Sequence, residues 1–315
     1  MTAPRTVIKA KLRPIVGSRF QPTGFPDLGA AEFDAIDPSN PDGTSDQRAL
    51  LVESTQSMAN RLEATTWDDA TSDQVPELTG LPYVRIVDAD GEFLSSSRLE
   101  AHRLASAYVM QGRVDGVSGE DWIRDRIGLR AGRPLDHRAV ARACFALDPV
   151  TLLHGVFFAR KSWPWQPRIA RAVTSFIEAY DVRPAVSGGV KRDGVINEAK
   201  DGATSEGYGT VPHHRVEYTA RQIVAYFTVD RTQLRAYGLP DPATALLEAL
   251  ADFEIGRLLD SGLRLRTACD LEVVEVDGPR PDAAEAATRL GKLIGECADQ
   301  FSPVTTVTWT GRTKK

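Results

Sequence analysis

The residues best suited to chemistry near the start of the chain lie in a loop rich in glycine and proline, GSRFQPTGFPDLG (residues 17–29). The loop places a cation, an aromatic ring and an amide next to one another, at Arg19, Phe20 and Gln21. These groups suit a phosphate, a base face and a base edge, so the loop is a candidate contact for a nucleotide chain. The alternative is a structured turn that Phe20 and Phe25 anchor to the core.

A second set of polar side chains lies in the segment ESTQSMANRLE, residues 53–63. At helical spacing Gln56 and Asn60 project together, and so do Ser57 and Arg61. Such a face can line the backbone of a bound nucleic acid. Ordinary solvated helix faces have the same composition, so that interpretation stays open as well.

The third set belongs to a glycine-rich segment with little apolar content, residues 187–211. Most cations of this region lie near its two ends, with Lys191 and Arg192 at one end and His214 and Arg215 at the other. We expect an exposed, mobile loop whose basic base can close over a polyanion. The alternative is a disordered surface excursion without a ligand.

Motifs of catalysis and metal binding do not occur in the sequence. The 5 histidines have no HExxH or HxH spacing, and GxSxG, GxxxxGK[ST], GxGxxG and CxxC are all missing. The tandem pair His213-His214 suits general acid–base chemistry in metal-free RNA cleavage, although such a pair more often contacts phosphate. We therefore expect no catalytic residue, no metal site and no cofactor.

The bulk composition predicts a globular protein with a sizeable core. The chain has 315 residues, of which 42% are hydrophobic and 26% are charged, enough for one large domain or two modest ones. No apolar run approaches the ~20 residues that span a bilayer, and the N-terminus lacks a signal-peptide pattern. The 3 cysteines have no paired spacing. Buried reduced thiols, a cytoplasmic location and no membrane contact are expected.

The charge balance limits how a polyanion can bind. A net charge of -5 provides no global attraction for a nucleic acid. Acidic stretches occur at residues 27–46, 68–77 and 270–277. A nucleic-acid site on this protein must therefore be a local basic groove.

Hydrophobic periodicity predicts an α+β fold with helices packed on a sheet. The expected strands are residues 6–15, 83–94 as a hairpin, 171–182, 215–229, 263–276 and 304–309. The expected helices are residues 45–62, 98–111, most of 119–158, 242–261 and 281–300. Residues 171–182 also fit a helix, but the strand is favoured.

Several long blocks of the sequence together resemble the Cas-seven-type backbone protein of type I-G (formerly I-U) CRISPR Cascade complexes, a member of the RAMP superfamily. The blocks are LRPIVGSRFQPTGFPDLGAAEF, RALLVESTQSMANRLE, SSRLEAHRLASAYV, DPVTLLHGVFFA, SFIEAYDVRPAVSGGVKRDGV, VPHHRVEYTARQIVAYFTVD and GLRLRTACDLE. They occur in the order of the family and run from Leu12 to Glu272.

The resemblance implies an RRM-like, ferredoxin-like core in a single RAMP-type domain, residues 1–315. It also implies a helical insertion at residues 95–165 and a protruding thumb at residues 187–214. The function implied is that of a non-catalytic subunit that binds the CRISPR guide RNA (crRNA). Such a subunit polymerises along the guide with other copies of itself in a helical filament, assembles with other Cascade subunits and meets target DNA through guide pairing.

Carried onto this chain, the resemblance and the local chemistry together give nine expected RNA contacts. They are Arg19, Gln21, Gln56, Asn60, Arg61, Lys191, Arg192, His214 and Arg215.

Two other functions stay open. RAMP relatives include endoribonucleases that act on guide or target RNA, and His214, Asp193 and Asp201 are the catalytic candidates for such an activity. The third possibility is an interaction scaffold that never touches nucleic acid.

Overall fold

The largest sheet of the protein has 7 strands in the order β18-β19-β1-β17-β14-β5-β4, and neighbouring strands in it are antiparallel. The computed structural model describes residues 3–25, 27–36, 47–191 and 211–311. The strands of this sheet are β1 (Arg5–Pro14), β4 (Glu32–Asp34), β5 (Arg48–Glu53), β14 (Val173–Tyr180), β17 (Gln222–Asp230), β18 (Leu263–Arg266) and β19 (Cys269–Asp277). With the helices below, they give the expected α+β fold.

Alternation along β1 decides which face of the sheet is buried. Ile8 and Leu12 are buried, whereas Lys9 and Lys11 between them are exposed. This period of two is what a strand with one covered face requires, and the strand expected at residues 6–15 is confirmed. The expected strand at residues 171–182 is confirmed too, because β14 alternates buried and half-buried positions along its whole length.

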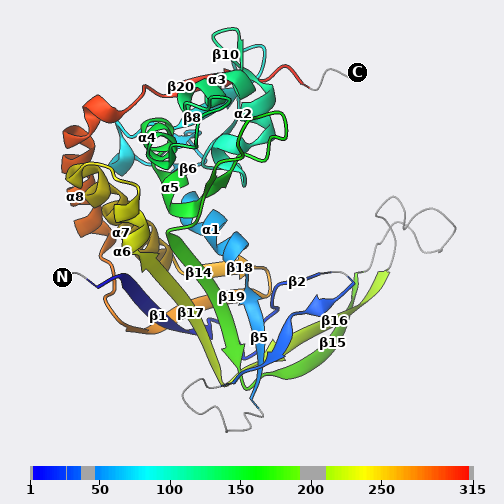
Figure 1. Ribbon diagram of the computed structural model, residues 1–315. Coiled ribbons are helices and arrows are strands. Elements are labelled where there is room, and N and C mark those ends of the chain that lie inside the picture. Colours follow the sequence, from blue (N-terminus) through cyan, green and yellow to red (C-terminus); the bar gives the residue numbers. More distant parts are fainter. Residues whose placement is uncertain (1–2, 26, 37–46, 192–210, 312–315) are drawn as a thin grey trace, which may run out of the picture.

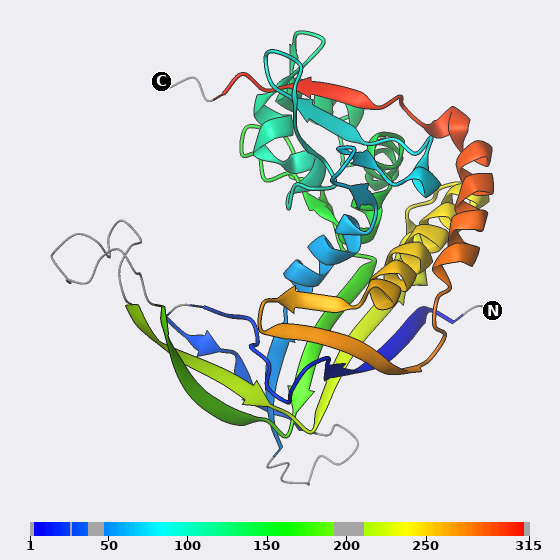
Figure 2. The same ribbon diagram turned by 180° about the vertical axis from the view of Figure 1, so that it is seen from behind.

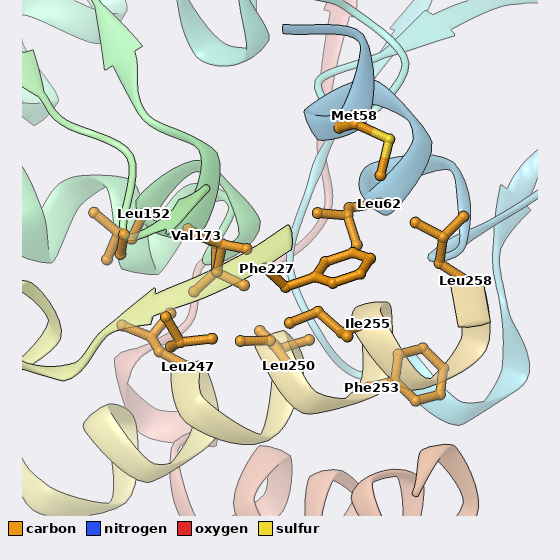
Figure 3. Close-up of a cluster of buried hydrophobic side chains, with 14 of the residues drawn as sticks. Met58, Leu62, Leu152, Val173, Phe227, Leu247, Leu250, Phe253, Ile255 and Leu258 are labelled. Atoms are coloured by element: carbon orange, nitrogen blue, oxygen red, sulfur yellow. The ribbon is translucent and has the colours of Figure 1, made fainter. Parts of the chain in front are cut away.

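Helices cover one face of this sheet, as Figures 1 and 2 show. They are α1 (Thr55–Ala64) and α7 (Asp241–Ser261), and α8 (Ala283–Glu296) packs against α7. Figure 3 shows where the layers meet: Met58 and Leu62 of α1 and Leu250 and Ile255 of α7 converge on Phe227 of β17. All of these side chains are at most 1% exposed.

A second lobe lies on the far side of α1 from the large sheet (Figure 1). It contains a 5-stranded sheet in the order β11-β10-β20-β8-β9. Its strands are β8 (Val84–Val87), β9 (Phe93–Ser96), β10 (Arg113–Val114), β11 (Val117–Ser118) and β20 (Thr305–Thr308), and its helices are α2 (Ala107–Gln111), α3 (Gly119–Arg126), α4 (His137–Leu147) and α5 (Val150–His154). Because β20 pairs with β8 in parallel, the end of the described chain completes this lobe.

The remaining elements are short, apart from one long ribbon. The short ones are β2 (Gly24–Phe25), β3 (Gly29–Ala30), β6 (Trp67–Asp68), β7 (Asp73–Gln74), β12 (Val156–Phe157), β13 (Arg168–Ile169) and α6 (Arg231–Ala236). The ribbon consists of β15 (Arg183–Lys191) and β16 (Val211–Thr219), which pair antiparallel from end to end.

This ribbon continues the core strands around a corner. β14 is followed by β15 and β16 by β17, and the backbone N–H of Arg221 donates to the carbonyl of Tyr180 at 3.1 Å across the corner. The expectation of a loop at residues 187–211 is therefore wrong at its ends, where residues 187–191 and 211 belong to strands; residues 192–210 lie outside the described part. The strand expected at residues 215–229 is likewise two strands, β16 and β17.

Two more sequence expectations are wrong in detail. Residues 45–62 do not form one helix: the apolar run of residues 48–53 is strand β5, and α1 begins after Ser54, whose side chain accepts a hydrogen bond from the backbone N–H of Ser57. A short apolar run is compatible with either structure, and here pairing with β4 and β14 selects the strand. Residues 263–276 form the hairpin β18–β19 rather than one strand.

Asp230 joins the start of α6 to β1. Its carboxylate accepts a hydrogen bond from the backbone N–H of Gln233 at 2.9 Å and lies 3.2 Å from the Arg5 guanidinium. The Gln233 hydrogen bond is the main cause that lowers the pKa of Asp230 below its ordinary value of 3.8. We expect Asp230→Ala to lower the free energy of unfolding by about 1 kcal/mol at neutral pH.

The same prediction has a pH dependence. A carboxyl whose pKa is lowered by folding stabilises the fold above its unfolded-state pKa and loses that effect as the pH falls through its folded-state pKa. Urea unfolding of the wild type and Asp230→Ala should therefore give free energies that converge at acidic pH. A gap that stays constant down to the acid limit of the folded state would contradict this role.

None of the helices in the described ranges combines the length and the apolar character needed to cross a bilayer.

Candidate nucleic-acid interface

Three of the residues expected to contact RNA meet where the ribbon joins the core. Arg19 and Arg215 both approach Glu217, with Nη1 of Arg19 3.3 Å from Oε2 and Nε of Arg215 3.5 Å from Oε1. Nη2 of Arg215 also donates to Oε1 of Gln21 at 3.0 Å. The Glu217 side chain is 10% exposed, whereas those of Arg19 and Arg215 are 55% and 33% exposed. The carboxylate therefore orients two cations that remain accessible.

The loop of residues 17–29 is held against the ribbon through Phe20. Its backbone N–H donates to the carbonyl of Tyr218, and the N–H of Tyr218 donates to the carbonyl of Phe20, both at 2.9 Å. The Phe20 side chain is 0% exposed. The interpretation of Phe20 as a base-stacking ring is therefore wrong, and the alternative of an anchor to the core is confirmed for Phe20; the side chain of Phe25 lies outside the described residues. The alternation of an extended chain places Arg19 and Gln21 on the other side.

The polar network continues from Gln21 into the core. Nη1 of Arg266 donates to the carbonyl of Gln21 at 2.7 Å, and its Nη2 pairs with Glu53. Glu53 is 2% exposed and also lies 3.6 Å from Nη2 of Arg61. We call this network the arginine seam; its members are Arg19, Arg61, Arg215, Arg266, Glu53 and Glu217. With four guanidinium groups on two carboxylates, it carries an excess of positive charge.

Arg61 connects this seam to the backbone of β18. Its Nη2 donates to the carbonyl of Leu265 at 2.6 Å, and its Nη1 to the carbonyl of Arg264 at 3.4 Å. These contacts tie α1 to β18. The expected RNA contact at Arg61 thus lies where the protein itself occupies most of the donors.

Gln56 and Asn60 lie apart from the seam. Both are exposed on α1 and line a different cleft, which also includes His102, Arg168 and Arg171. Adjacent helix positions project about 100° apart, so Asn60 and its neighbour Arg61 serve different faces of α1. The structure therefore divides the residues expected on α1 between two sites.

The remaining expected contacts belong to the ribbon and its continuation. His214 is exposed on β16, opposite Gly188. The side chain of Lys191 and the whole of Arg192, Asp193 and Asp201 lie outside the described residues.

Sequence reasoning missed Arg266, Glu53 and Glu217. The LRLR pattern at residues 263–266 does carry a signal for Arg266, because arginine at alternate strand positions marks the polar face. Nothing in the sequence marks the two glutamates, because a buried carboxylate is explained only by the cations around it.

The Cys269 thiol borders this network, beside the Arg266 guanidinium. Cys144, Cys269 and Cys297 are unbridged and buried, as expected. Burial raises the pKa of the Cys144 thiol to about 12, which leaves it protonated and unreactive at neutral pH. Across the described ranges, no three His, Cys, Asp or Glu side chains converge in a way that could hold a metal ion.

Comparison with known proteins gives the family. A family model described as CRISPR-associated protein GSU0053 matches residues 6–184. No curated protein matches the sequence. A solved structure described as "CRISPR RNA-guided surveillance complex, pre-nicking" aligns with 94% of this chain and 89% of its own chain, at 12% identity and a TM-score of 0.43. A similarity of that size is too distant to carry an argument. Because the family model covers more than half of its length, the chain belongs to the CRISPR-associated protein GSU0053 family.

Proposed function

We propose that this protein is a non-catalytic crRNA-binding backbone subunit of a type I CRISPR Cascade complex, of the Cas-seven type found in subtype I-G. The arginine seam at the base of the ribbon is the observation that carries the proposal. It presents Arg19 and Arg215 on a fixed carboxylate, beside a loop that the core anchors. Membership of a CRISPR-associated family supports the same conclusion.

The chemistry of the seam suits a guide RNA that must keep its bases free. Guanidinium groups bind phosphate oxygens through two parallel hydrogen bonds and do not distinguish sequences. In an RNA-guided complex the sequence is recognised by base pairing with the target, so the protein needs contacts to the backbone of the guide. A local cationic seam also allows a protein with a net charge of -5 to bind a polyanion.

The topology supports the RRM-like, ferredoxin-like core and the thumb of the proposal. In chain order, β1, α1, β14, β17, α7 and β19 follow the β-α-β-β-α-β pattern of that fold. Their strands lie side by side as β19-β1-β17-β14. The ribbon β15–β16 extends from the ends of the adjacent core strands β14 and β17 and forms the base of the proposed thumb, residues 187–214.

The partners follow from this role. They are the crRNA, other copies of this chain in a filament along it, the other Cascade subunits and target DNA paired to the guide.

The proposal predicts a loss of guide binding when the seam loses its exposed cations. We expect Arg19→Ala with Arg215→Ala to weaken binding of a single-stranded guide RNA about tenfold or more. The slope of log affinity against log salt should fall by about 1.4, which is the loss of two phosphate contacts to a single strand. Fluorescence anisotropy of a labelled guide at several salt concentrations measures both quantities.

A matched control removes the same charge elsewhere. Arg142→Ala with Arg280→Ala deletes two guanidinium groups whose side chains are 57% and 50% exposed and lie outside the seam. This variant should keep the affinity and the salt slope of the wild type. Equal losses in the two double variants would mean that net charge, and not the seam, determines binding.

The non-catalytic part of the proposal has its own test. Purified protein is incubated with repeat RNA and with guide-paired target RNA, with and without magnesium. Intact RNA is the expected result. Specific cleavage that His214→Ala or Asp193→Ala abolishes would replace this proposal with the endoribonuclease.

A further inference from the structure

A second polar cleft, on another face of α1, lies between this helix and the hairpin formed by β12 and β13. Its volume is about 550 Å³, within the ~300–1,000 Å³ typical of small-ligand sites. Its chemistry comes from six side chains, Gln56, Asn60, His102, Phe157, Arg168 and Arg171. We call it the α1 cleft.

An aromatic ring forms part of one wall of this cleft. Phe157 is 48% exposed. It lies directly opposite Arg168 in the β12–β13 register, and the guanidinium carbon of Arg168 is 5.8 Å from the centre of the ring. Because Arg168 lies over one face of the ring and the ring is partly open to solvent, a nucleobase could stack on the part that Arg168 leaves uncovered.

Two of the three arginines that line the α1 cleft, Arg168 and Arg171, form no ion pair with a carboxylate within residues 3–25, 27–36, 47–191 and 211–311. The Glu63 carboxylate acts on Arg171 only from beyond ion-pair distance. Nε of Arg171 donates to the carbonyl of His154 at 3.2 Å, which fixes the side chain. The charge of the neighbouring Arg103 is already neutralised by Glu63, with Nη2 2.7 Å from Oε2.

The pKa of Arg171 agrees with this charge distribution. Burial lowers the pKa of its guanidinium and the positive charge of Arg103 lowers it further, which outweighs the opposite effect of the Glu63 carboxylate. An anion placed beside Arg171 would relieve that unfavourable potential.

Amide groups face this pair of cations from α1. Gln56 and Asn60 are exposed, one helical turn apart, and their side chains have no hydrogen-bond partner in the part of the chain that the structure describes. Each offers donors and an acceptor, as the edge of a base or a sugar hydroxyl requires. His102, also exposed, adds a further polar group to the cleft.

We propose that the α1 cleft binds one nucleotide of a single-stranded nucleic acid, with the base stacked on Phe157 and the phosphate between Arg168 and Arg171. The base must come from a single strand, because a paired and stacked base has no free face to offer. This site is separate from the arginine seam, which contacts α1 through Arg61. It extends the proposed function with a second point of contact for nucleic acid, but it does not depend on the seam.

Crosslinking tests the position of the base. The full chain is irradiated with a single-stranded RNA that contains 4-thiouridine, and crosslinked peptides are identified by mass spectrometry. A crosslink at Phe157 that disappears in Phe157→Ala is the expected result. Crosslinks at the seam alone would overturn the α1 cleft and leave the proposed function intact. Crosslinks at the α1 cleft alone would support the cleft and overturn the arginine seam as the guide contact, and crosslinks at neither site would overturn both the cleft and the proposed function.

Affinity measurements separate stacking from charge. Phe157→Ala should weaken binding of a labelled oligouridylate about tenfold at an unchanged salt slope, and Phe157→Tyr should restore it. Arg168→Ala with Arg171→Ala should instead reduce the salt slope by about 1.4. Trp165→Ala, which removes another exposed aromatic side chain (44%) outside the cleft, should bind like the wild type.

Competition with a mononucleotide tests whether the α1 cleft binds a nucleotide within a chain or a free nucleotide. Uridine monophosphate should compete with the oligouridylate only weakly, because it lacks the neighbouring contacts of the chain. If uridine monophosphate binds as tightly as the oligomer and Phe157→Ala abolishes that binding, the site serves a free nucleotide, which overturns the proposal. Unchanged oligomer binding in both the Phe157→Ala and the Arg168→Ala/Arg171→Ala variants would overturn it as well.

Discussion

Glu63→Ala is expected to lower the free energy of unfolding by about 3–5 kcal/mol. Glu63 is 1% exposed and accepts two hydrogen bonds from Arg103, from Nε at 2.5 Å and from Nη2 at 2.7 Å. Alanine would leave the Arg103 guanidinium, whose side chain is 5% exposed, with its charge buried and without its counterion. Urea unfolding at neutral pH, followed by circular dichroism, measures the loss.

Two further variants make this prediction specific. Glu296→Ala breaks an exposed ion pair with Lys292, in which the side chains are 79% and 42% exposed, and should change the stability by less than about 1 kcal/mol. Combining Glu63→Ala with Arg103→Met should recover part of the loss, because no charge then remains buried. If Glu63→Ala destabilises the protein no more than Glu296→Ala does, the buried pair is not the structural support described above.

Phe227→Ala is the second substitution for which we expect a large effect, again about 3–5 kcal/mol. Its ring is 0% exposed and lies where α1, α7 and the large sheet meet (Figure 3). The truncation removes contacts in all three layers, and the close-packed surroundings cannot collapse fully into the resulting cavity. A lower urea midpoint with an unchanged dependence on urea is the expected result.

The matched control is the same substitution at an exposed ring. Phe157→Ala should change the free energy of unfolding by no more than about 0.5 kcal/mol, because the ring of Phe157 is 48% exposed. A comparable loss at both positions would contradict the placement of Phe157 at the surface. It would also mean that weaker RNA binding by Phe157→Ala could be caused by a loss of folded protein.

The elements that sequence patterns predicted well are those with long and unambiguous periods. α7, expected at residues 242–261, and α8, expected at residues 281–300, differ from the structure mainly at their ends. The error at residues 45–62 arose because a short apolar run fits a strand and a helix equally well. Only the neighbouring strands β4 and β14 decide in favour of β5.

The residue types at the candidate site could be predicted from the sequence, but the contacts between them could not. The sequence indicated Arg19, Gln21 and Arg215 as separate polar groups, and their convergence depends on the pairing of β15 with β16 and on the Phe20–Tyr218 bridge. The α1 cleft shows the same limit. Gln56 and Asn60 were expected to accompany Arg61, yet the packing of α1 between two lobes separates them.

The corner where β14 becomes β15 and β16 becomes β17 restricts how the length of the ribbon β15–β16 can vary among related proteins. Each strand of the ribbon is a direct extension of a central strand of the sheet. A deletion in β15 or β16 alone would therefore shift the register of all β15–β16 pairs beyond the deletion. Removing one residue from each of β15 and β16 would keep the pairing but exchange the two faces of the ribbon. Natural variants should therefore lengthen or shorten the paired part by even numbers of residues in each of the two strands. Odd differences should be confined to the connection between the strands.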